Sequence, residues 1–426
     1  MVSNFIQSIV LLTDAAFISR YDTNAFDAVG NAGLMYITLY VALGGMGDGA
    51  QILIARRIGQ NKEQTIHRIF SNSLLTHFLI ATVLFCFAQF ILPGMMHSFV
   101  RHPDLANYQT KFIAIRSYAL FFVMITLSIQ ALMLAQGKTW VVMVSAVLIA
   151  GTNIFFDWAL IFGNAGFPEM GLEGAALAST MADGIGMLFL VGYLFLGGDA
   201  KKYNLFKNIK IEWALYKELI KVGAPLSLQG FVALGTWTIF FIWIEQMGKF
   251  ELTVSQNIRS IYFLVFVPIW GFAGTTKTYI SQYLGAGALD QLSKIQRRIQ
   301  LLTLSFLFLF FHGAIFYPEQ LIRFLNPSEI HVLKSAEILR YISISIFIYG
   351  SVSVYYQTIN GSGNTNVTFI IETTCVIVYV FTAYLFIKVW NWDIFWVWTV
   401  EYVYFSMMGL LSIGYLRLFD WKKKVI

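Results

Sequence analysis

Long apolar runs recur from one end of this chain to the other. One of them, residues 140–163, contains Asp157 as its only charged residue. Each run is close to the ~20 residues with which a helix crosses the roughly 30 Å hydrocarbon core of a bilayer. A strand of a transmembrane barrel needs only about 10 residues of alternating polarity. Because only 12% of the residues are charged, the runs predict an all-α polytopic membrane protein.

The runs predict about twelve membrane spans in two sets of six. We expect an N-lobe at residues 1–196, a cytoplasmic linker at 197–221 and a C-lobe at 222–426. The first six spans are expected near 3–19, 29–54, 69–92, 114–135, 140–163 and 173–196, and the other six near 222–245, 253–284, 300–317, 336–359, 366–388 and 394–416.

Basic residues gather on one side of these predicted spans. The connection 55–68, the linker 197–221 and the C-terminal residues 417–424 hold many of them. Cytoplasmic loops carry an excess of Lys and Arg, so we expect both termini in the cytoplasm. Since the net charge of +6 arises from these alternate loops, it does not predict a nucleic-acid partner.

The two halves resemble each other. The segment "GGMGDGAQILIARRIGQ" after the second span is similar to "WGFAGTTKTYISQYLGA" after the eighth, with Gly45 opposite Gly271 and Gly59 opposite Gly285 (285 − 59 = 226). Six spans is an even number, so both copies enter the membrane in the same sense. This predicts two six-helix lobes related by pseudo-two-fold symmetry, with substrate bound between them and access alternating by rocking.

Polar residues stand inside some of the predicted spans. In "NIFFDWALIF", Asn153 and Asp157 are four residues apart and share one helix face. Gln7 and Asp14 are seven apart and share a face of the first span. A charge at the bilayer centre costs about 2.5–3.5 kcal/mol on insertion scales, so such residues indicate function. Their oxygens suit Na⁺ and equally a proton, and a hydrogen-bonded packing pair is the structural alternative.

The second half lacks this cluster at the same offset. Asp14 is opposite Phe240, Asn153 opposite Tyr379 and Asp157 opposite Ala383. We therefore expect the ion site in the first half only. The remaining acids in or near spans have no assigned role, although Glu372 and Arg259 are candidates for an ion pair; these acids are Asp48, Asp183, Glu245, Glu372 and Glu401.

Four aromatic residues are candidates to line a substrate cavity through stacking and cation–π contacts. Ordinary helix packing is the alternative for each of them. They are Tyr36, Trp158, Trp237 and Tyr356.

No enzyme signature is present. The six histidines are scattered without metal-ligand spacing, and no phosphate-binding loop occurs. Cys86 and Cys375 lie in apolar runs and are predicted to be core residues rather than a disulfide or metal site. We expect a protein that is not an enzyme, has no cofactor, and performs any transport on an ion gradient.

Several stretches resemble the multidrug and toxic compound extrusion (MATE) family of transporters. They are "GGMGDGAQILIARRIGQ", "AQGKTW", "NIFFDWALIFGNAGFPEMGLEGAALAST" and "SQYLGAG", and the resemblance covers nearly the whole chain. It implies an antiporter of the cell inner (cytoplasmic) membrane that exports organic cations and amphiphiles in exchange for entering Na⁺ or H⁺. It also implies a V-shaped cavity between two lobes.

The resemblance also implies site residues. One branch of the family binds the coupling cation at positions that match Asp14, Gln7, Asn153 and Asp157, and a span-6 hydroxyl falls on Ser179. If Na⁺ is the coupling ion, Asp14, Asn153 and Asp157 are the implied metal ligands. The chain begins in what is usually the middle of span 1, so we expect either a start upstream of Met1 or a short first span.

The chain also departs from another branch, which uses acids in spans 7 and 10. Span 10 has no acid, and Glu245 lies later in span 7 than that pattern requires, which favours the N-lobe site. The rival transport function is a flippase for a lipid-linked precursor, and a membrane enzyme or a scaffold is a more distant alternative. We expect small amphiphilic or cationic substrates, contact with membrane lipids, no nucleic-acid partner and a monomeric chain.

Overall fold

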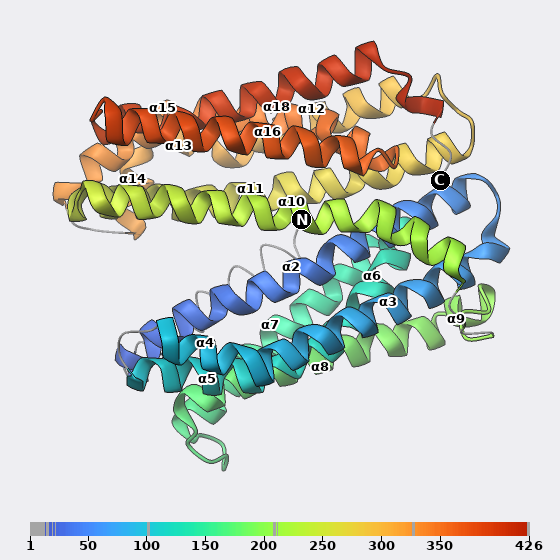
Figure 1. The fold of residues 1–426 in the computed structure, drawn as a ribbon, viewed down its shortest axis with the longest axis horizontal. Coiled ribbons are helices and arrows are strands. Elements are labelled where there is room, and N and C mark those ends of the chain that lie inside the picture. Colours follow the sequence, from blue (N-terminus) through green and yellow to red (C-terminus); the bar gives the residue numbers. More distant parts are fainter. Residues whose placement is uncertain are drawn as a thin grey trace. The chain divides into compact units, whose positions relative to one another are not determined.

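A computed structural model describes most of the chain. The described residues are 13, 17–18, 20–21, 23–99, 103–207, 210, 212–325 and 329–423. Every regular element that they form is helical (Figure 1), which confirms the all-α class. The predicted site residues Gln7 and Asp14 lie outside the described residues.

The first half forms long helices joined by short turns, because apolar runs in a bilayer must satisfy their backbone hydrogen bonds internally. Its elements are α2 (Thr23–Gly59), η1 (Glu63–Thr65), α3 (Ile66–Cys86), the π-helical turn η2 (Phe87–Ile91), α4 (Leu92–Phe99), α5 (Pro103–Ser117), α6 (Ala119–Ala135), α7 (Thr139–Phe162), α8 (Gly171–Leu196) and α9 (Asp199–Lys202).

The second half is built in the same way. Its elements are α10 (Trp213–Met247), α11 (Lys249–Gly285), α12 (Leu292–Phe311), α13 (Gly313–Phe316), α14 (Pro318–Leu325), α15 (Glu329–Gly361), α16 (Thr365–Tyr384), the π-helical turn η3 (Leu385–Val389), α17 (Ile394–Val397), α18 (Val400–Leu418) and η4 (Trp421–Lys423).

Within the described ranges, nine helical segments are long and apolar enough to cross a membrane. Helices α5 and α6 meet the same criterion only as a pair, which bends by 44° between Ser117 and Ala119. Helix α12 occupies the ninth predicted span. Most of the first predicted span lies outside the described residues, so the observed helices account for the other eleven predicted spans.

Helix boundaries confirm the internal repeat. Helices α2 and α11 each contain 37 residues, and both their starts and their ends differ by 226 (249 − 23 and 285 − 59). The same offset relates both ends of α4 to those of α14 and the start of α7 to that of α16. Gly137 and Gly363, the paired glycines before α7 and α16, have φ of +77° and +86°, a left-handed conformation that favours glycine.

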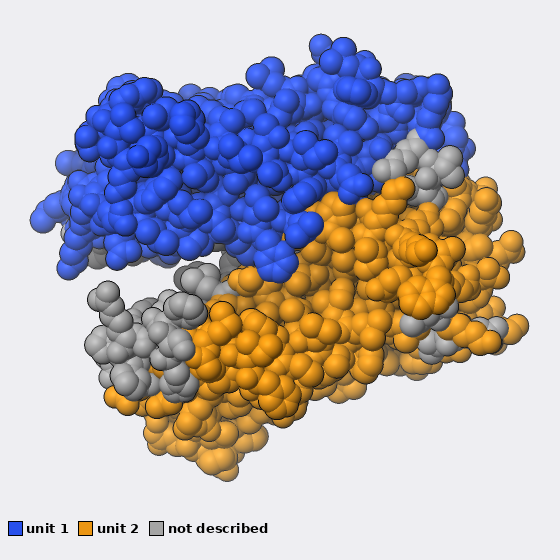
Figure 2. Space-filling model, viewed as in Figure 1, with its two compact units in different colours: residues 1, 228–426 blue, residues 2–227 orange. Residues whose placement is uncertain are grey.

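The chain divides into two compact units (Figure 2). The N-terminal unit holds residues 2–227 and the C-terminal unit holds residues 1 and 228–426, so the division falls inside α10. The start of α10 packs tightly on α2 in the N-terminal unit. A Cβ atom on Gly45 would lie 2.2 Å from the backbone nitrogen of Ser227, and one on Gly49 would lie 2.8 Å from Cα of Gly223. The glycines of "GGMGDG" therefore permit this close crossing.

Buried polar contacts hold the N-terminal unit together. His77 on α3 contacts the Ser128 hydroxyl on α6 at 2.9 Å and the Leu43 carbonyl on α2 at 3.2 Å. Ser71 donates to the Leu205 carbonyl, and the Glu212 amide donates to the Asn72 side chain. Much of the segment between α8 and α10 is thus attached to α3.

The two cysteines differ in burial. Cys375 is buried, as predicted, whereas Cys86 is exposed, so the prediction of a core residue is wrong there. The apolar run around Cys86 belongs to a helix with a large outward face. In a membrane, lipid accepts apolar side chains as readily as the protein core does, so hydropathy does not separate the two environments.

An ion pair with a buried carboxylate joins the first residue of α9 to Lys138, the residue before α7. Asp199, which is 3% exposed, accepts hydrogen bonds from Lys138 Nζ at 2.7 and 2.6 Å through its two carboxylate oxygens. Removing one partner of a buried pair leaves an uncompensated charge, which is strongly destabilising.

We predict that Lys138→Met lowers the stability of the N-terminal unit by roughly 3 kcal/mol. Thermal unfolding of the purified protein in detergent measures the loss. The matched control is Arg68→Met, because Arg68 pairs with Glu212 at 3.6 Å with both side chains about half exposed, and such pairs contribute about 1 kcal/mol or less. Equal losses in the two variants would show that burial of Asp199 is unimportant.

Candidate functional site

The predicted pair Asn153 and Asp157 lies one helical turn apart on α7, and Asn153 contacts α8. Asn153 is 1% exposed and Asp157 is fully buried. Asn153 Nδ2 donates a hydrogen bond of 3.2 Å to the hydroxyl of Ser179 on α8. The structure therefore brings Asn153 and Ser179 together, with Asp157 one turn further along α7. Gln7 and Asp14 lie outside the described residues.

Two glycines of α8 make this close packing possible. A Cβ atom on Gly174 would lie 2.6 Å from the carbonyl oxygen of Leu160, and one on Gly186 would lie 2.4 Å from Cγ1 of Ile149. Both neighbours belong to α7. The glycines stand five residues before and seven residues after Ser179, so they hold the two helices close on either side of the Asn153–Ser179 bond.

The interface presents oxygen atoms rather than cations. The Asn153 side-chain oxygen is buried and accepts no hydrogen bond from the described residues. It shares a helix face with the Asp157 carboxylate, and the Ser179 hydroxyl contributes a third oxygen-bearing group. Hard cations such as Na⁺ prefer oxygen ligands of this type, and a buried carboxylate is also a proton acceptor.

An ion pair stands one helical turn further along α8. Asp183, four residues after Ser179, accepts a hydrogen bond of 2.8 Å from Arg116 Nη1 in the last turn of α5. The Arg116 guanidinium also lies over the ring of Tyr36, 4.1 Å from its centroid. The sequence had indicated Asp183 but not its partner, because the distance along the chain gives no sign that Arg116 faces it.

The four predicted cavity aromatics are divided between the two units. Tyr36 is buried and Trp158 is 43% exposed in the N-terminal unit. In the C-terminal unit, Trp237 packs against Phe266 with ring centroids 6.1 Å apart, and the Tyr356 hydroxyl donates to the Thr368 carbonyl at 3.2 Å. The cavity role of these residues stays a prediction.

The acids of the C-terminal unit have partners that the sequence did not indicate. The Tyr404 hydroxyl donates to Glu372, and the Tyr379 hydroxyl donates to Glu401 at 3.0 Å. The Arg259 guanidinium instead lies over the ring of Phe241, 4.6 Å from its centroid. Glu372 thus accepts a hydrogen bond from a tyrosine, whereas Arg259, its candidate ion-pair partner, lies over Phe241.

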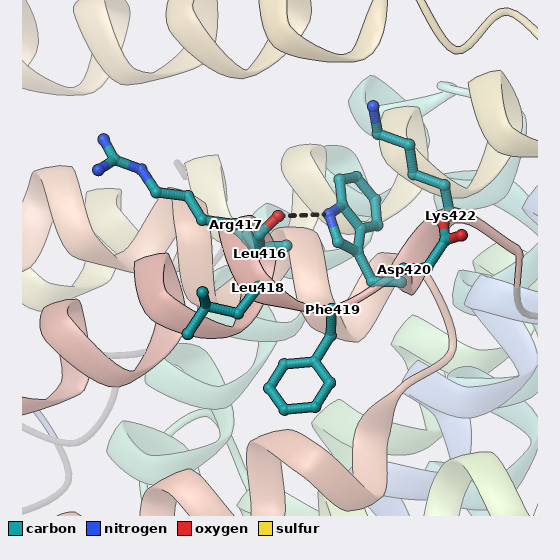
Figure 3. A pocket seen from close by; sticks show the side chains of 7 residues that line it. Leu416, Arg417, Leu418, Phe419, Asp420 and Lys422 are labelled. Atoms are coloured by element: carbon teal, nitrogen blue, oxygen red, sulfur yellow. Dashed lines mark hydrogen bonds between the residues drawn. The ribbon is translucent and has the colours of Figure 1, made fainter.

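A small pocket at the end of α18 is separate from these residues (Figure 3). Seven consecutive residues, 416–422, line it. Trp421 Nε1 closes one side by donating to the Leu416 carbonyl at 3.1 Å. None of the predicted site residues lines this pocket.

Comparison with known proteins gives matches along most of the chain. The model of the MatE family matches residues 1–159 and 225–385. The probable multidrug resistance protein NorM of Thermotoga maritima is 25% identical over 371 residues, which are 86% of this chain and 78% of that protein. The probable multidrug resistance protein YoeA of Bacillus subtilis is 22% identical over 432 residues, which cover 100% and 93%.

A solved structure shows the same fold. A MOP superfamily transporter from Pyrococcus furiosus superposes with a TM-score of 0.88 over 100% of this chain and 94% of its own. The two sequences are 17% identical, so this similarity concerns the fold alone.

We predict that Gly174→Ala separates α7 from α8 and lowers both thermal stability and any transport activity. The added methyl group meets the Leu160 backbone, which cannot move aside as a flexible side chain can. Gly192→Ala in the same helix is the matched control, because its Cβ would meet nothing within 4 Å and alanine favours a helix by about 1 kcal/mol. A Gly174→Ala variant as stable as Gly192→Ala would show that the close packing has no importance.

Proposed function

We infer the function from one finding of the comparisons, namely that the chain belongs to the MatE family. It is a multi-pass membrane protein of a family of multidrug efflux transporters. We propose that it is a cation-coupled antiporter that exports organic cations and other amphiphiles by alternating access, and that its coupling ion binds between α7 and α8.

One observation supports the placement of the ion site: the hydrogen bond from Asn153 to Ser179, one helical turn from the fully buried Asp157. The bond uses the amide nitrogen of Asn153, so the amide oxygen stays available on the helix face that it shares with Asp157. A packing contact alone requires no carboxylate there, since the ionised form is costly in the membrane interior. A bound ion accounts for the carboxylate, because it compensates the negative charge.

The same cost explains how ion binding would drive a conformational change. Burial makes an ionised Asp157 costly, and a bound cation reduces that cost. Loading therefore shifts the population between two packings of the N-terminal unit. In antiport, the packing that binds the cation more tightly is the one that releases substrate outward.

The coupling ion is Na⁺ or H⁺ in this proposal. With Na⁺, the ligands include oxygens of Asn153 and Asp157, with Ser179 beside them and with Asp14 and Gln7 supplying the opposite wall. With H⁺, Asp157 and Asp14 share the proton, and the amides stabilise the arrangement by hydrogen bonds.

The proposal also includes the location, the oligomeric state and the substrates of the protein. We place the protein in the cytoplasmic membrane as a monomer with both termini in the cytoplasm, following the positive-inside rule. Its substrates are small amphiphilic or cationic molecules, and Tyr36, Trp158, Trp237 and Tyr356 contact them.

We predict that Asp157→Asn abolishes ion-driven export. Export of a fluorescent organic cation from proteoliposomes is measured under an imposed Na⁺ gradient and, separately, an imposed H⁺ gradient. The wild type should respond to at least one gradient and Asp157→Asn to neither. The control is Glu173→Gln, because Glu173 is a half-exposed acid in the first turn of α8. Full gradient-driven export by Asp157→Asn would contradict the mechanism, and transport of a lipid-linked precursor instead of the cation would favour a flippase.

We predict that Ser179→Ala weakens the apparent affinity for the driving cation several-fold, whereas Ser179→Thr leaves it near the wild-type value. The alanine removes the acceptor of the Asn153 bond, and one hydrogen bond contributes about 1 kcal/mol. Initial export rates at increasing cation concentration give the affinity. Identical affinities in the two variants would place the Ser179 hydroxyl outside the site.

A further inference from the structure

The C-terminal unit contains its own pair of buried carboxylates. Glu372 on α16 is 5% exposed and Glu401 on α18 is 1% exposed. Tyr404 on α18 donates its hydroxyl to Glu372, and Tyr379 on α16 donates its hydroxyl to Glu401 at 3.0 Å. Each helix thus supplies an acid to the other helix's tyrosine.

The two acid–tyrosine pairs are joined to each other. The rings of Tyr379 and Tyr404 meet edge to face with centroids 5.5 Å apart. Glu372 and Glu401 therefore belong to one cluster that crosses the α16–α18 interface, with aromatic rings between the two carboxylates.

This interface is the repeat equivalent of the candidate ion site. Helix α16 begins 226 residues after α7 (365 − 139), and Tyr379 occupies the position of Asn153 (379 − 153). Helix α18 follows α16 as α8 follows α7. The second half therefore has a buried polar cluster of its own in this interface, although the positions equivalent to Asn153 and Asp157 hold Tyr379 and Ala383. The cluster in the second half was missed because its acids stand at different positions, opposite Ala146 and Ala175 (372 − 226 and 401 − 226).

The groups around the two glutamates carry no compensating positive charge. Tyr356 and Tyr349 on α15, Tyr404 on α18 and Cys375 face Glu372. Tyr379 and, from α11, Tyr262 face Glu401. Among the ion pairs of the described residues, none includes either glutamate.

The chemistry of these neighbours indicates which ligand the acids take. Tyrosine hydroxyls here donate hydrogen bonds to the carboxylates, so they do not offer the several oxygen ligands that a metal cation needs. A proton requires only one carboxylate oxygen, and it removes the cost of a buried negative charge that has no positively charged partner.

We propose that Glu372 and Glu401 form a second proton-binding site, located in the C-terminal unit and separate from the α7–α8 site. Each carboxylate takes up one proton from water to become a neutral acid and returns it on deprotonation. While a glutamate is ionised, the hydrogen bond that it accepts from its tyrosine stabilises the negative charge. Proton binding here does not depend on the proposed antiport, although a role in driving export rests on that function.

Infrared difference spectroscopy of the reconstituted protein tests the site directly. A protonated carboxyl group has its own carbonyl-stretch band, which disappears on ionisation. As the pH is raised, the wild type should lose intensity in this band, and Glu372→Gln and Glu401→Gln should each remove part of the loss. Glu337→Gln is the control, since Glu337 is a largely exposed acid of the same unit and should leave the buried-carboxyl signal unchanged.

Two further variants separate the possible failures. Asp157→Asn should keep the Glu372 and Glu401 signals, so loss of export in that variant concerns the proposed function and not this site. Tyr404→Phe removes the donor to Glu372 while keeping the ring, and it should shift the midpoint of the Glu372 signal by about one pH unit. The proposal is overturned if both Gln variants titrate like the wild type, or if Tyr404→Phe leaves every midpoint unchanged.

Discussion

The close contact of α7 with α8 is the constraint on which the candidate site depends. Gly174 and Gly186 bring the α8 backbone close to the Leu160 backbone and the Ile149 side chain of α7, and at that distance Ser179 meets Asn153. Because water is absent from the hydrocarbon core, polar groups in such an interface must find partners within the protein or in a bound ion. The glycines, the hydroxyl, the amide and the carboxylate thus form one arrangement, in which the packing sets the chemistry.

The internal repeat places a second interface of the same kind in the other unit. Helices α16 and α18 are the equivalents of α7 and α8, and they too bury carboxylates, although with tyrosine hydroxyls as partners. The two units differ elsewhere as well, since the segment 103–135 is bent between α5 and α6 whereas its equivalent is the continuous α15. The two interfaces share a backbone arrangement but differ in their polar groups, as expected when a duplicated unit later acquires separate roles.

Local patterns of the sequence predicted the fold and part of the site. Apolar run lengths gave the spans, the 226-residue offset predicted matching ends of α2 and α11, and four-residue spacing placed Asn153 and Asp157 on one face. The family resemblance had indicated Ser179 beside Asn153. Arg116 beside Asp183 and Tyr404 beside Glu372 were missed, because neither partner has a signature along the chain. Cys86 shows a further limit, since an apolar run looks the same whether it faces lipid or protein.

The proposed antiport requires a cation that binds at Asp157. Measurement of cation binding to the purified protein tests this requirement most simply. Titration calorimetry with Na⁺, repeated at several pH values with release of protons followed in parallel, measures binding without any transported drug. The proposed function predicts saturable Na⁺ binding, or in its place proton uptake beyond that of Glu372 and Glu401, that is present in the wild type and lost in Asp157→Asn. Unchanged cation and proton binding in a folded Asp157→Asn protein would contradict it.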